Sequence, residues 1–229
     1  SQERDIVNIN WKDRDVDIVL ECTGKFNSRQ NAEIHIENGA KRVLFSAPAS
    51  DVDITIVYGV NHEKLKSTHE IVSNASCTTN CLAPVVQVLN EAVGIEHGFM
   101  TTVHSYTGDQ PLLDKDHKDI YRARAAGLNM IPTSTGAAKA VGLVLPELEG
   151  RLNGVSVRVP TPNVSMIDLT FNAMRDTNAE EINDAIRKAS KSSKLKGILG
   201  FTDEKLVSGD FNHNSHSAIF HTDQTNVTG

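Results

Sequence analysis

The sequence predicts an α/β protein in which a partial doubly wound parallel sheet of the Rossmann type is followed by an α+β domain with a mostly antiparallel sheet. Two observations support this fold class. Up to Ser76, short β-rich runs alternate with a helical pattern over short links, which is typical of βα units and a parallel sheet. From residue 98 onward, strands with alternating apolar and polar residues prevail, which favours a more antiparallel sheet. We therefore place a domain boundary near Ser76.

Four strands and one helix are expected in the first part. Each strand is a short apolar run bounded by turn residues, and the first run ends at the turn Cys22-Thr23-Gly24. The helix carries its apolar residues on or near one face, and Gly39 follows as a C-terminal stop. The predicted strands lie at 15–21, 41–45, 54–58 and 70–73, and the predicted helix at 28–38.

The second part is expected to begin with a helix at 77–93, in which Pro84 predicts either a bend or an irregular first turn. A strand at 99–104 follows. Residues 105–130 then form a long polar segment with mixed charges. Such a long irregular segment in a compact domain is usually functional.

Alternation and one helix-start signal predict the remaining elements. Between Val155 and Val159 the three valines face one way and the polar residues the other, and 164–172 alternates in the same manner. Thr177-x-x-Glu180 is a capping box, which predicts that a helix opens there. Short strands are expected within 205–221.

The composition argues against several classes of protein, among them nucleic-acid-binding and membrane-spanning proteins. The chain has 229 residues and a formal net charge of −6, so it lacks the basic footprint of nucleic-acid-binding proteins. No apolar run approaches the ~20 residues that cross a bilayer. We expect no membrane partner, and because no leader pattern is present we expect a cytoplasmic protein. Three cysteines are few and odd in number, which argues for a reducing compartment.

Cys77 is the strongest candidate for chemistry. It follows a strand and a polar turn and lies at a predicted helix N-terminus, where backbone N–H groups and the helix dipole stabilise a thiolate. A buried, inert cysteine is the alternative, but the Ser, Thr and Asn neighbours do not form an apolar pocket. Cys22 and Cys81 are expected to be structural. A metal bound by Cys77 and Cys81 is disfavoured because few histidines lie nearby in the sequence.

His104 is the candidate base for this nucleophile. It ends a predicted strand and opens the polar segment, and sites assemble at strand C-terminal ends in α/β architectures. A structural role is the alternative for a histidine at such a position. His213-x-x-His216, with His221 nearby, suggests a metal site, but it lies in a polar loop without a carboxylate, so we predict no metal.

A third group of residues suits anion binding. The run Thr-Ser-Thr-Gly-Ala-Ala-Lys at 133–139 places hydroxyls and a glycine before an Ala-rich helix start, where N–H groups bind phosphate. Arg122, Arg124 and Arg158 supply guanidinium donors that suit phosphate oxygens. Each arginine alone could equally form a surface ion pair, but several arginines flanked by Ser, Thr and Gly turns favour a phosphate site.

Five ordered motifs together resemble phosphorylating glyceraldehyde-3-phosphate dehydrogenase, in its bacterial and plastid-like branch. The resemblance runs from about residue 15 to the end. The motifs are Ser-Asn-Ala-Ser-Cys-Thr-Thr-Asn-Cys-Leu-Ala-Pro at 73–84, Thr-Val-His-Ser-Tyr-Thr-Gly-Asp-Gln at 102–110, Arg-Ala-Arg-Ala-Ala at 122–126, Thr-Gly-Ala-Ala-Lys-Ala-Val at 135–141 and Arg-Val-Pro-Thr-Pro-Asn-Val-Ser at 158–165.

The resemblance implies a role for each matching position. Cys77 corresponds to the nucleophile and His104 to the general base. Thr107 and Arg158 correspond to the pocket for the phosphate of the substrate. The pocket for inorganic phosphate corresponds to Ser76, Thr78, Arg122, Thr135 and Gly136, and the loops lining the cofactor cleft correspond to Thr23, Gly24, Phe26, Ser46 and Ala47.

The resemblance also implies what the sequence lacks. The chain corresponds to an internal portion of the family, without the N-terminal Gly-rich cofactor motif and the C-terminal helix. Residues 1–76 would be the C-terminal half of an NAD-binding domain and 77–229 the catalytic domain. Glyceraldehyde 3-phosphate, inorganic phosphate and a homo-oligomer, a tetramer in the intact protein, are the implied partners.

NAD is the implied cofactor, with NADP less favoured. Lys115-Asp116 stands where the NADP-using branch has small residues, and a carboxylate there would repel a 2′-phosphate, although Lys115 could attract it. Tyr121 stands where an arginine is common. Two alternative functions stay open: an erythrose-4-phosphate dehydrogenase-like enzyme, which the run at 133–139 disfavours, and a non-catalytic fragment that keeps only phosphate-binding or oligomer contacts.

Overall fold

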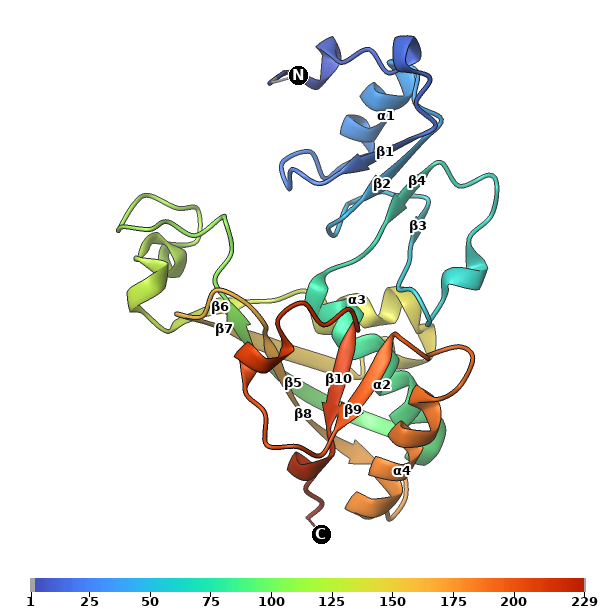
Figure 1. Cartoon of the computed structure of the whole chain (residues 1–229), viewed down its shortest axis with the longest axis vertical. Helices are drawn as coiled ribbons and strands as arrows, with labels where there is room; N and C mark the ends of the chain where they lie inside the picture. Colours follow the sequence, from blue (N-terminus) through green and yellow to red (C-terminus); the bar gives the residue numbers. More distant parts are fainter. Residues whose placement is uncertain (1–2, 229) are drawn as a thin grey trace. The chain divides into compact units, whose positions relative to one another are not determined.

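The computed structural model describes residues 3–228, and these form two compact units that divide between Asn80 and Cys81 (Figure 1). The division falls inside the helix α2 (Cys77–Val93), close to the boundary predicted near Ser76. Each unit has its own sheet. The two units are described in turn.

The first unit is built on a four-stranded sheet in the order β1-β2-β4-β3, with every pairing parallel. The four predicted strands are confirmed, although each is shorter than the apolar run that predicted it. Their bounds are β1 Ile18–Glu21, β2 Arg42–Phe45, β3 Ile54–Thr55 and β4 Ile71–Ser73. A parallel sheet brings the carboxyl ends of its strands to one edge, where loops can form a ligand site.

The predicted helix is confirmed as α1 (Arg29–Glu37), which is capped by the Ser28 side chain accepting from the Asn31 N–H. Its Ala32 packs in a buried cluster with residues of β1, β2 and β4. Gly39 ends the helix with a φ of +108°, and a Cβ there would approach the Lys12 backbone to within 2.7 Å. Glycine is therefore required at this position for both conformation and space.

An ion pair ties α1 to the loop before β3. Arg29 Nη2 lies 2.5 Å from Asp53 Oδ1, and Asp53 Oδ2 accepts from the N–H groups of Glu70 and Ile71 at 2.8 and 3.0 Å. Burial raises the pKa of Asp53, but the Ile71 N–H, the Arg29 guanidinium and the Glu70 N–H together outweigh it and lower this pKa to about 2. The ionised carboxylate therefore stabilises the fold.

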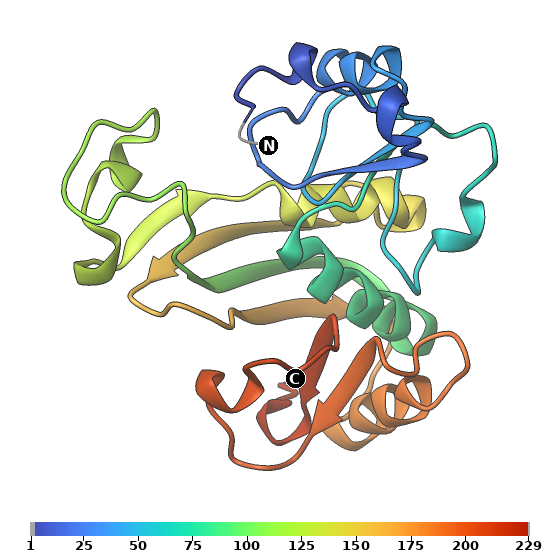
Figure 2. The ribbon, with the colours of Figure 1, turned by 45° about the horizontal axis from the view of Figure 1, so that its top comes forward.

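The second unit holds a mixed four-stranded sheet in the order β6-β7-β5-β8 (Figure 2). The β5–β8 and β6–β7 pairings are antiparallel and the β5–β7 pairing is parallel. The strands are β5 Ile95–Ser105, β6 Ile131–Ser134, β7 Leu152–Val159 and β8 Met166–Ala173. The sequence predicts three of them. It does not predict β6, whose Pro132 and hydroxyl residues are typical of a turn.

The alternation predicted for 155–159 is confirmed, and the covered face is the polar one. Ser156 is 3% exposed, whereas Val155 is 42% exposed. Arg158 shares the face of Ser156 because side chains two residues apart in a strand point the same way. The sheet therefore directs Arg158 toward the covered side of the unit.

Three helices and a small sheet complete the second unit. The helix predicted at 77–93 is confirmed as α2, which begins at Cys77 and continues through Pro84 without interruption. Helix α3 (Ala137–Val144) packs beside β7, and α4 (Ala179–Ser190) packs beside β9 (Leu199–Thr202). Strand β9 pairs in parallel with β10 (Ala218–His221), so only β10 lies within the range predicted for short strands.

The start predicted for α4 is wrong by one residue. Asn178, and not Thr177, is the N-cap, since its side chain accepts from the Glu181 N–H at 2.9 Å. The Thr177 hydroxyl donates to the Glu181 carboxylate instead, at 2.8 Å. Asparagine caps helices as well as threonine does, so either residue could take the position.

Replacing the anchoring carboxylate of the first unit should make its stability less dependent on pH. We expect Asp53→Asn to lower the free energy of unfolding by about 1 kcal/mol near neutral pH, a value discounted for partial exposure. Because the folded pKa of Asp53 lies below its ordinary 3.8, its contribution is present above about pH 4 and is lost as the pH falls toward 2. Urea unfolding at stepped pH measures this.

Asp51→Asn is the matched control, because Asp51 Oδ2 lies 3.9 Å from Arg29 and its side chain is exposed. A difference between the wild type and Asp53→Asn that stays constant from pH 6 to pH 2 would contradict the assignment.

Candidate active site

Cys77 begins helix α2, after a turn held together by polar side chains. Ser76 Oγ accepts from the Thr79 N–H at 3.0 Å, and the Asn80 side chain donates to the Asn74 carbonyl at 2.7 Å. Ala75 lies in the left-handed region with a φ of 56°. The Cys77 side chain is exposed, and its sulfur lies 4.0 Å from the Thr78 hydroxyl. The positive end of the helix dipole therefore lies at an accessible thiol.

The other two cysteines differ in their surroundings. None of the three, all within the described residues, forms a disulfide. Cys81 is half-buried in α2, as a packing residue would be. Cys22 is exposed after the end of β1, so the expectation that it is structural is wrong with respect to packing. Exposure alone does not distinguish Cys22 from Cys77, whereas the position at a helix N-terminus does.

His104 is buried, 7% exposed, near the end of β5. Its Nδ1 lies 2.7 Å from the Ser105 carbonyl oxygen. A carbonyl can only accept, so Nδ1 carries the proton of the neutral ring and the lone pair is on Nε2. This tautomer is the one that a general base acting through Nε2 requires.

Arg158 joins two strand ends. The register of β5 and β7 places it directly opposite His104. Its Nη1 donates to the Thr107 hydroxyl at 2.7 Å, to the Ser105 carbonyl at 3.1 Å and to Gln110 Oε1 at 3.4 Å. The structure therefore brings together the predicted pair Thr107 and Arg158, next to the predicted base.

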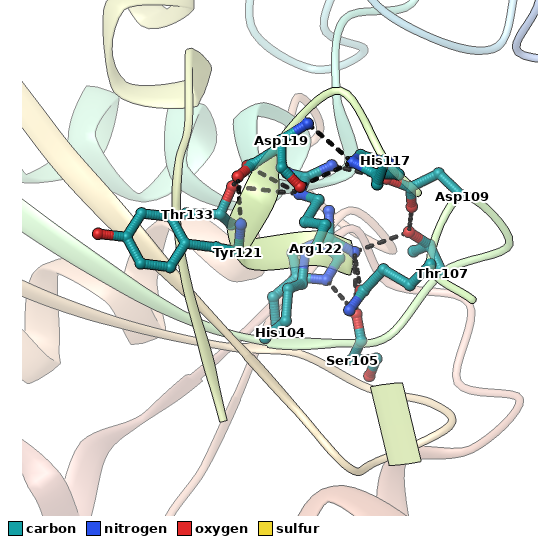
Figure 3. Close-up of polar contacts among 11 residues, drawn as sticks. His104, Ser105, Thr107, Asp109, His117, Asp119, Tyr121, Arg122 and Thr133 are labelled. Carbon is teal, nitrogen blue, oxygen red and sulfur yellow. Dashed lines mark hydrogen bonds and ion pairs between the residues drawn. The ribbon is translucent and has the colours of Figure 1, made fainter. Parts of the chain in front are cut away.

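Asp109 links this pair to a second arginine (Figure 3). The Thr107 hydroxyl donates to Asp109 Oδ1, and Arg122 Nη1 donates to Asp109 Oδ2 at 2.7 Å. Burial raises the pKa of Asp109, but the hydrogen bonds from Thr107 and Arg122 and the charges of Arg122 and Arg158 hold this pKa below its ordinary value. An ionised carboxylate thus lies between two groups predicted to bind anions.

Arg122 is also held from its other side. Its Nε donates to the Thr133 hydroxyl at 3.1 Å, and that hydroxyl donates to Asp119 Oδ2 at 2.8 Å. The hydrogen bond from Thr133 is the main cause that lowers the pKa of Asp119, with burial opposing it. The Arg122 side chain is only 19% exposed. Arg122 therefore points into the network of Figure 3 and not into solvent.

The remaining residues predicted for inorganic phosphate do not join this network through a hydrogen bond described here. Thr135 Oγ1 accepts from the Ala137 N–H at 3.2 Å, and Gly136 is the exposed N-cap of α3. Ser76 and Thr78 belong to the first unit. Cys77 also belongs to the first unit and His104 to the second, so the assembly of these residues around one reacting carbon stays a prediction.

The residues predicted to line the cofactor cleft lie at the carboxyl ends of β1 and β2. Thr23, Gly24 and Phe26 follow β1, while Ser46 and Ala47 follow β2. The Ser46 N–H donates to the Glu21 carbonyl at 3.1 Å, which joins the two loops. Gly24 has a φ of +70° and no heavy atom within 4 Å of a Cβ built there. An open rim of parallel strand ends with exposed backbone fits a nucleotide cofactor.

Among residues 3–228, no group of three or more His, Cys, Asp or Glu residues is arranged to hold a metal ion. In the same range, no helix is long and apolar enough to cross a membrane.

Comparison with known proteins decides the family. Residues 76–229 match the family model described as "Glyceraldehyde 3-phosphate dehydrogenase, C-terminal domain". The chain belongs to the glyceraldehyde-3-phosphate dehydrogenase family. It is 67% identical over 224 residues to the glyceraldehyde-3-phosphate dehydrogenase of Xanthobacter flavus, covering 98% of this chain and 67% of that protein.

Two further relatives of the same printed name agree. The protein of Cereibacter sphaeroides is 66% identical over 212 residues, which cover 93% of this chain and 63% of the relative. The protein of Pseudomonas aeruginosa is 58% identical over 226 residues, which cover 99% of this chain and 67% of the relative. The chain therefore spans about two thirds of the length of the curated glyceraldehyde-3-phosphate dehydrogenases that it matches, and the resemblance stated from its motifs is confirmed.

Sequence reasoning missed the carboxylates that hold these side chains. Asp109 and Asp119 both pair with Arg122, and Glu21 fixes the turn after β1. Asp109 stands two residues after Thr107 in a turn, a spacing at which a threonine hydroxyl and an aspartate carboxylate can meet. That local signal was available, whereas the pairing with Arg122 depends on the fold of the whole segment.

Cys77 should react with iodoacetamide at least about tenfold faster than Cys22 at neutral pH, because a helix N-terminus favours the reactive thiolate. Both side chains are exposed, so the comparison separates activation from access. Peptide mapping after short labelling times measures both rates. Cys77→Ser, in which the Cys22 rate should not change, is the control. Equal rates at Cys22 and Cys77 would contradict an activated thiolate.

Asp109→Asn should loosen the segment 106–130, since the carboxylate holds Thr107 and Arg122 at once. We expect amide hydrogen exchange in that segment to accelerate about fivefold to fiftyfold, which corresponds to ~1–2 kcal/mol. Asp116→Asn, at an exposed position of the same segment, is the control and should leave exchange unchanged. The same acceleration in both variants would show that Asp109 has no special role.

Proposed function

We propose that this protein catalyses the NAD-dependent oxidative phosphorylation of glyceraldehyde 3-phosphate to 1,3-bisphosphoglycerate in the cytoplasm, as a step of glycolysis or gluconeogenesis. The observation that carries the proposal is the cluster of His104, Thr107 and Arg158, in which a candidate base lies beside a guanidinium and a hydroxyl that suit an anion. Membership of the glyceraldehyde-3-phosphate dehydrogenase family supports it.

In the proposed reaction, the Cys77 thiolate attacks the aldehyde carbon and forms a thiohemiacetal. His104 Nε2 accepts the hydroxyl proton, while the Ser105 carbonyl keeps the imidazole oriented through Nδ1. The nicotinamide cofactor, when bound, supplies the hydride acceptor for oxidation to the thioester. Thr23, Gly24, Phe26, Ser46 and Ala47 are the residues of this chain that would hold it.

The second half of the reaction is phosphate transfer. Inorganic phosphate attacks the thioester carbon, the carbon–sulfur bond breaks and the Cys77 thiolate leaves, so an acyl phosphate is formed. A thioester suits this step because it keeps the energy that hydrolysis would lose. We assign the phosphate of the triose to Thr107 and Arg158, and the attacking phosphate to Arg122 with Ser76, Thr78, Thr135 and Gly136. Two fixed anions orient the reacting groups.

We propose NAD over NADP as the cofactor. Asp116 and Lys115 are both exposed, and the Asp116 carboxylate would repel a 2′-phosphate, although Lys115 could attract it. Competing binding of the two cofactors to the complete protein tests this preference.

We also propose a homo-oligomer, a tetramer in the intact protein. One face of the second sheet exposes Phe99, Val155 and Met166, at 47%, 42% and 60%. The register places them on adjacent strands of the same sheet. Further large apolar side chains are exposed on the segment 106–130, namely Leu112, Leu113, Ile120, Leu128 and Met130. Large exposed apolar side chains of this kind are common at protein interfaces, and sedimentation equilibrium of the protein tests the oligomer.

Arg158→Leu in the complete protein tests the assignment of the triose phosphate. We expect the KM for glyceraldehyde 3-phosphate to rise about tenfold to a hundredfold, because charge-assisted hydrogen bonds contribute ~1.5–3 kcal/mol. The KM for glyceraldehyde, which has no phosphate, should change little. Steady-state kinetics with both aldehydes measure this difference.

Arg124→Leu is the control, since Arg124 is exposed and its Nε lies 2.9 Å from Asp114 Oδ2, outside the cluster. Equal losses on both aldehydes would show that Arg158 acts on the fold and not on the phosphate. A faster wild-type rate with erythrose 4-phosphate than with glyceraldehyde 3-phosphate would overturn the proposed substrate, and no turnover at all would favour the non-catalytic alternative.

A further inference from the structure

Glu21 is a buried acid that the proposed reaction does not use. It is the last residue of β1 and is 4% exposed. Its Oε1 accepts from the Thr23 N–H at 2.7 Å and from the Thr23 hydroxyl at 2.5 Å. A buried carboxylate is costly unless it is hydrogen-bonded or paired, so these bonds fix the turn after β1 to the carboxylate.

A buried histidine contacts the other carboxylate oxygen of Glu21, and the indole of Trp11 contacts that histidine. His35, 2% exposed and in the last turn of α1, places Nε2 at 3.5 Å from Glu21 Oε2. Its Nδ1 lies 3.0 Å from Trp11 Nε1. An indole nitrogen can only donate, so Nδ1 carries the lone pair of the ring and Nε2 carries the proton. The 3.5 Å contact between Nε2 and Glu21 Oε2 is close enough for electrostatic support but does not have hydrogen-bond geometry.

Glu21 uses both hydrogen-bond donors of Thr23. Both its N–H and its hydroxyl proton go to Glu21, and Thr23 Oγ1 accepts from the Lys25 N–H at 3.2 Å. Thr23 therefore has no proton to donate to a ligand while Glu21 holds it. The Glu21 carbonyl also accepts from the Ser46 N–H at 3.1 Å and the Ser46 hydroxyl at 3.3 Å. One residue thus anchors the loops after both β1 and β2.

We propose that Glu21, supported by His35, is a positioning residue for the nucleotide cofactor, and that Thr23 acts through Glu21 and not as a donor to the cofactor. This inference rests on the proposed function, because it takes the loops after β1 and β2 as the cofactor rim. Its specific consequence is that Glu21 and Thr23 contribute to cofactor affinity as one unit. A second consequence is that the fluorescence emission of Trp11 should change when the loops after β1 and β2 lose their contacts with Glu21.

The test is a double-mutant cycle in the complete protein, with Glu21→Gln, Thr23→Val and the double variant. We expect each single change to weaken NAD binding about tenfold, measured by calorimetry, and the double variant to bind no more weakly than Glu21→Gln alone. The kcat of Glu21→Gln at saturating NAD should stay within about twofold, because the reacting groups are untouched. Thr23→Ser should restore wild-type affinity, since it keeps both donors.

Three more variants extend the test. Glu37→Gln removes a carboxylate at an exposed position of α1 and should change neither affinity nor emission. The Trp11 emission of the ligand-free protein should shift in Glu21→Gln, with Trp11→Phe used to isolate its share. His35→Gln should weaken NAD binding while kcat is retained. Because His35 is buried and cannot contact the cofactor itself, such a loss would act through Glu21. This variant therefore replaces Glu21→Gln in the test if Glu21→Gln does not fold.

The outcomes separate the two proposals. Additive losses of NAD affinity from Glu21→Gln and Thr23→Val would show that Thr23 contacts the cofactor directly, and unchanged affinity in Glu21→Gln would show that the turn does not need the carboxylate. Either result overturns this inference while the wild type still oxidises glyceraldehyde 3-phosphate with NAD. A wild type that binds no NAD would instead overturn the proposed function.

Discussion

The anion site that we propose for this chain depends on a carboxylate placed between two guanidinium groups. Asp109 contacts Arg122 directly and Arg158 through the Thr107 hydroxyl. Without a negative charge between them, Arg122 in the polar segment and Arg158 on β7 would repel each other. The Asp109 charge therefore holds Arg122 and the Thr107–Arg158 pair in the arrangement that we propose receives a phosphate. Preorganisation of this kind lowers the cost of binding an anion.

In the first unit, the same type of interaction, a threonine hydroxyl that donates to a carboxylate, fixes a different loop. Glu21 is buried and holds the turn after β1 through two donors of Thr23, as Asp109 holds Thr107 in the second unit. In both places a threonine hydroxyl donates its proton to a carboxylate, which fixes the orientation of its lone pairs. Arg158 then donates to the Thr107 oxygen. Thr23 and Thr107 thus each link a carboxylate to a neighbouring N–H donor.

Sequence patterns predicted the elements whose signals are local. Helix α2 begins and ends at the residues expected, because the polar turn before Cys77 and the apolar stripe after it are both short-range features. Strand β6 was missed because Ile-Pro-Thr-Ser is typical of a turn, and a proline is tolerated there since β6 lies at the edge of its sheet. The carboxylates were missed for another reason. Arg122 stands 13 residues after Asp109 along an irregular segment, and no periodicity specifies that pairing.

The direction in which Arg158 points shows how the sheet and the site constrain each other. A pattern of valines alternating with Ser156 and Arg158 ordinarily places the valines inside, yet Ser156 is buried and Val155 is exposed. The parallel register of β5 and β7 puts Arg158 beside His104, and a slip of one residue would send it to the opposite face. On β7 the face that holds Ser156 and Arg158 is covered, so Val155 is left exposed on the other face of the sheet. Exposed Phe99, Val155 and Met166 on that face cost free energy in water, a cost that a second copy of the chain would remove. The buried polar site and the proposed oligomer are therefore two consequences of one strand register.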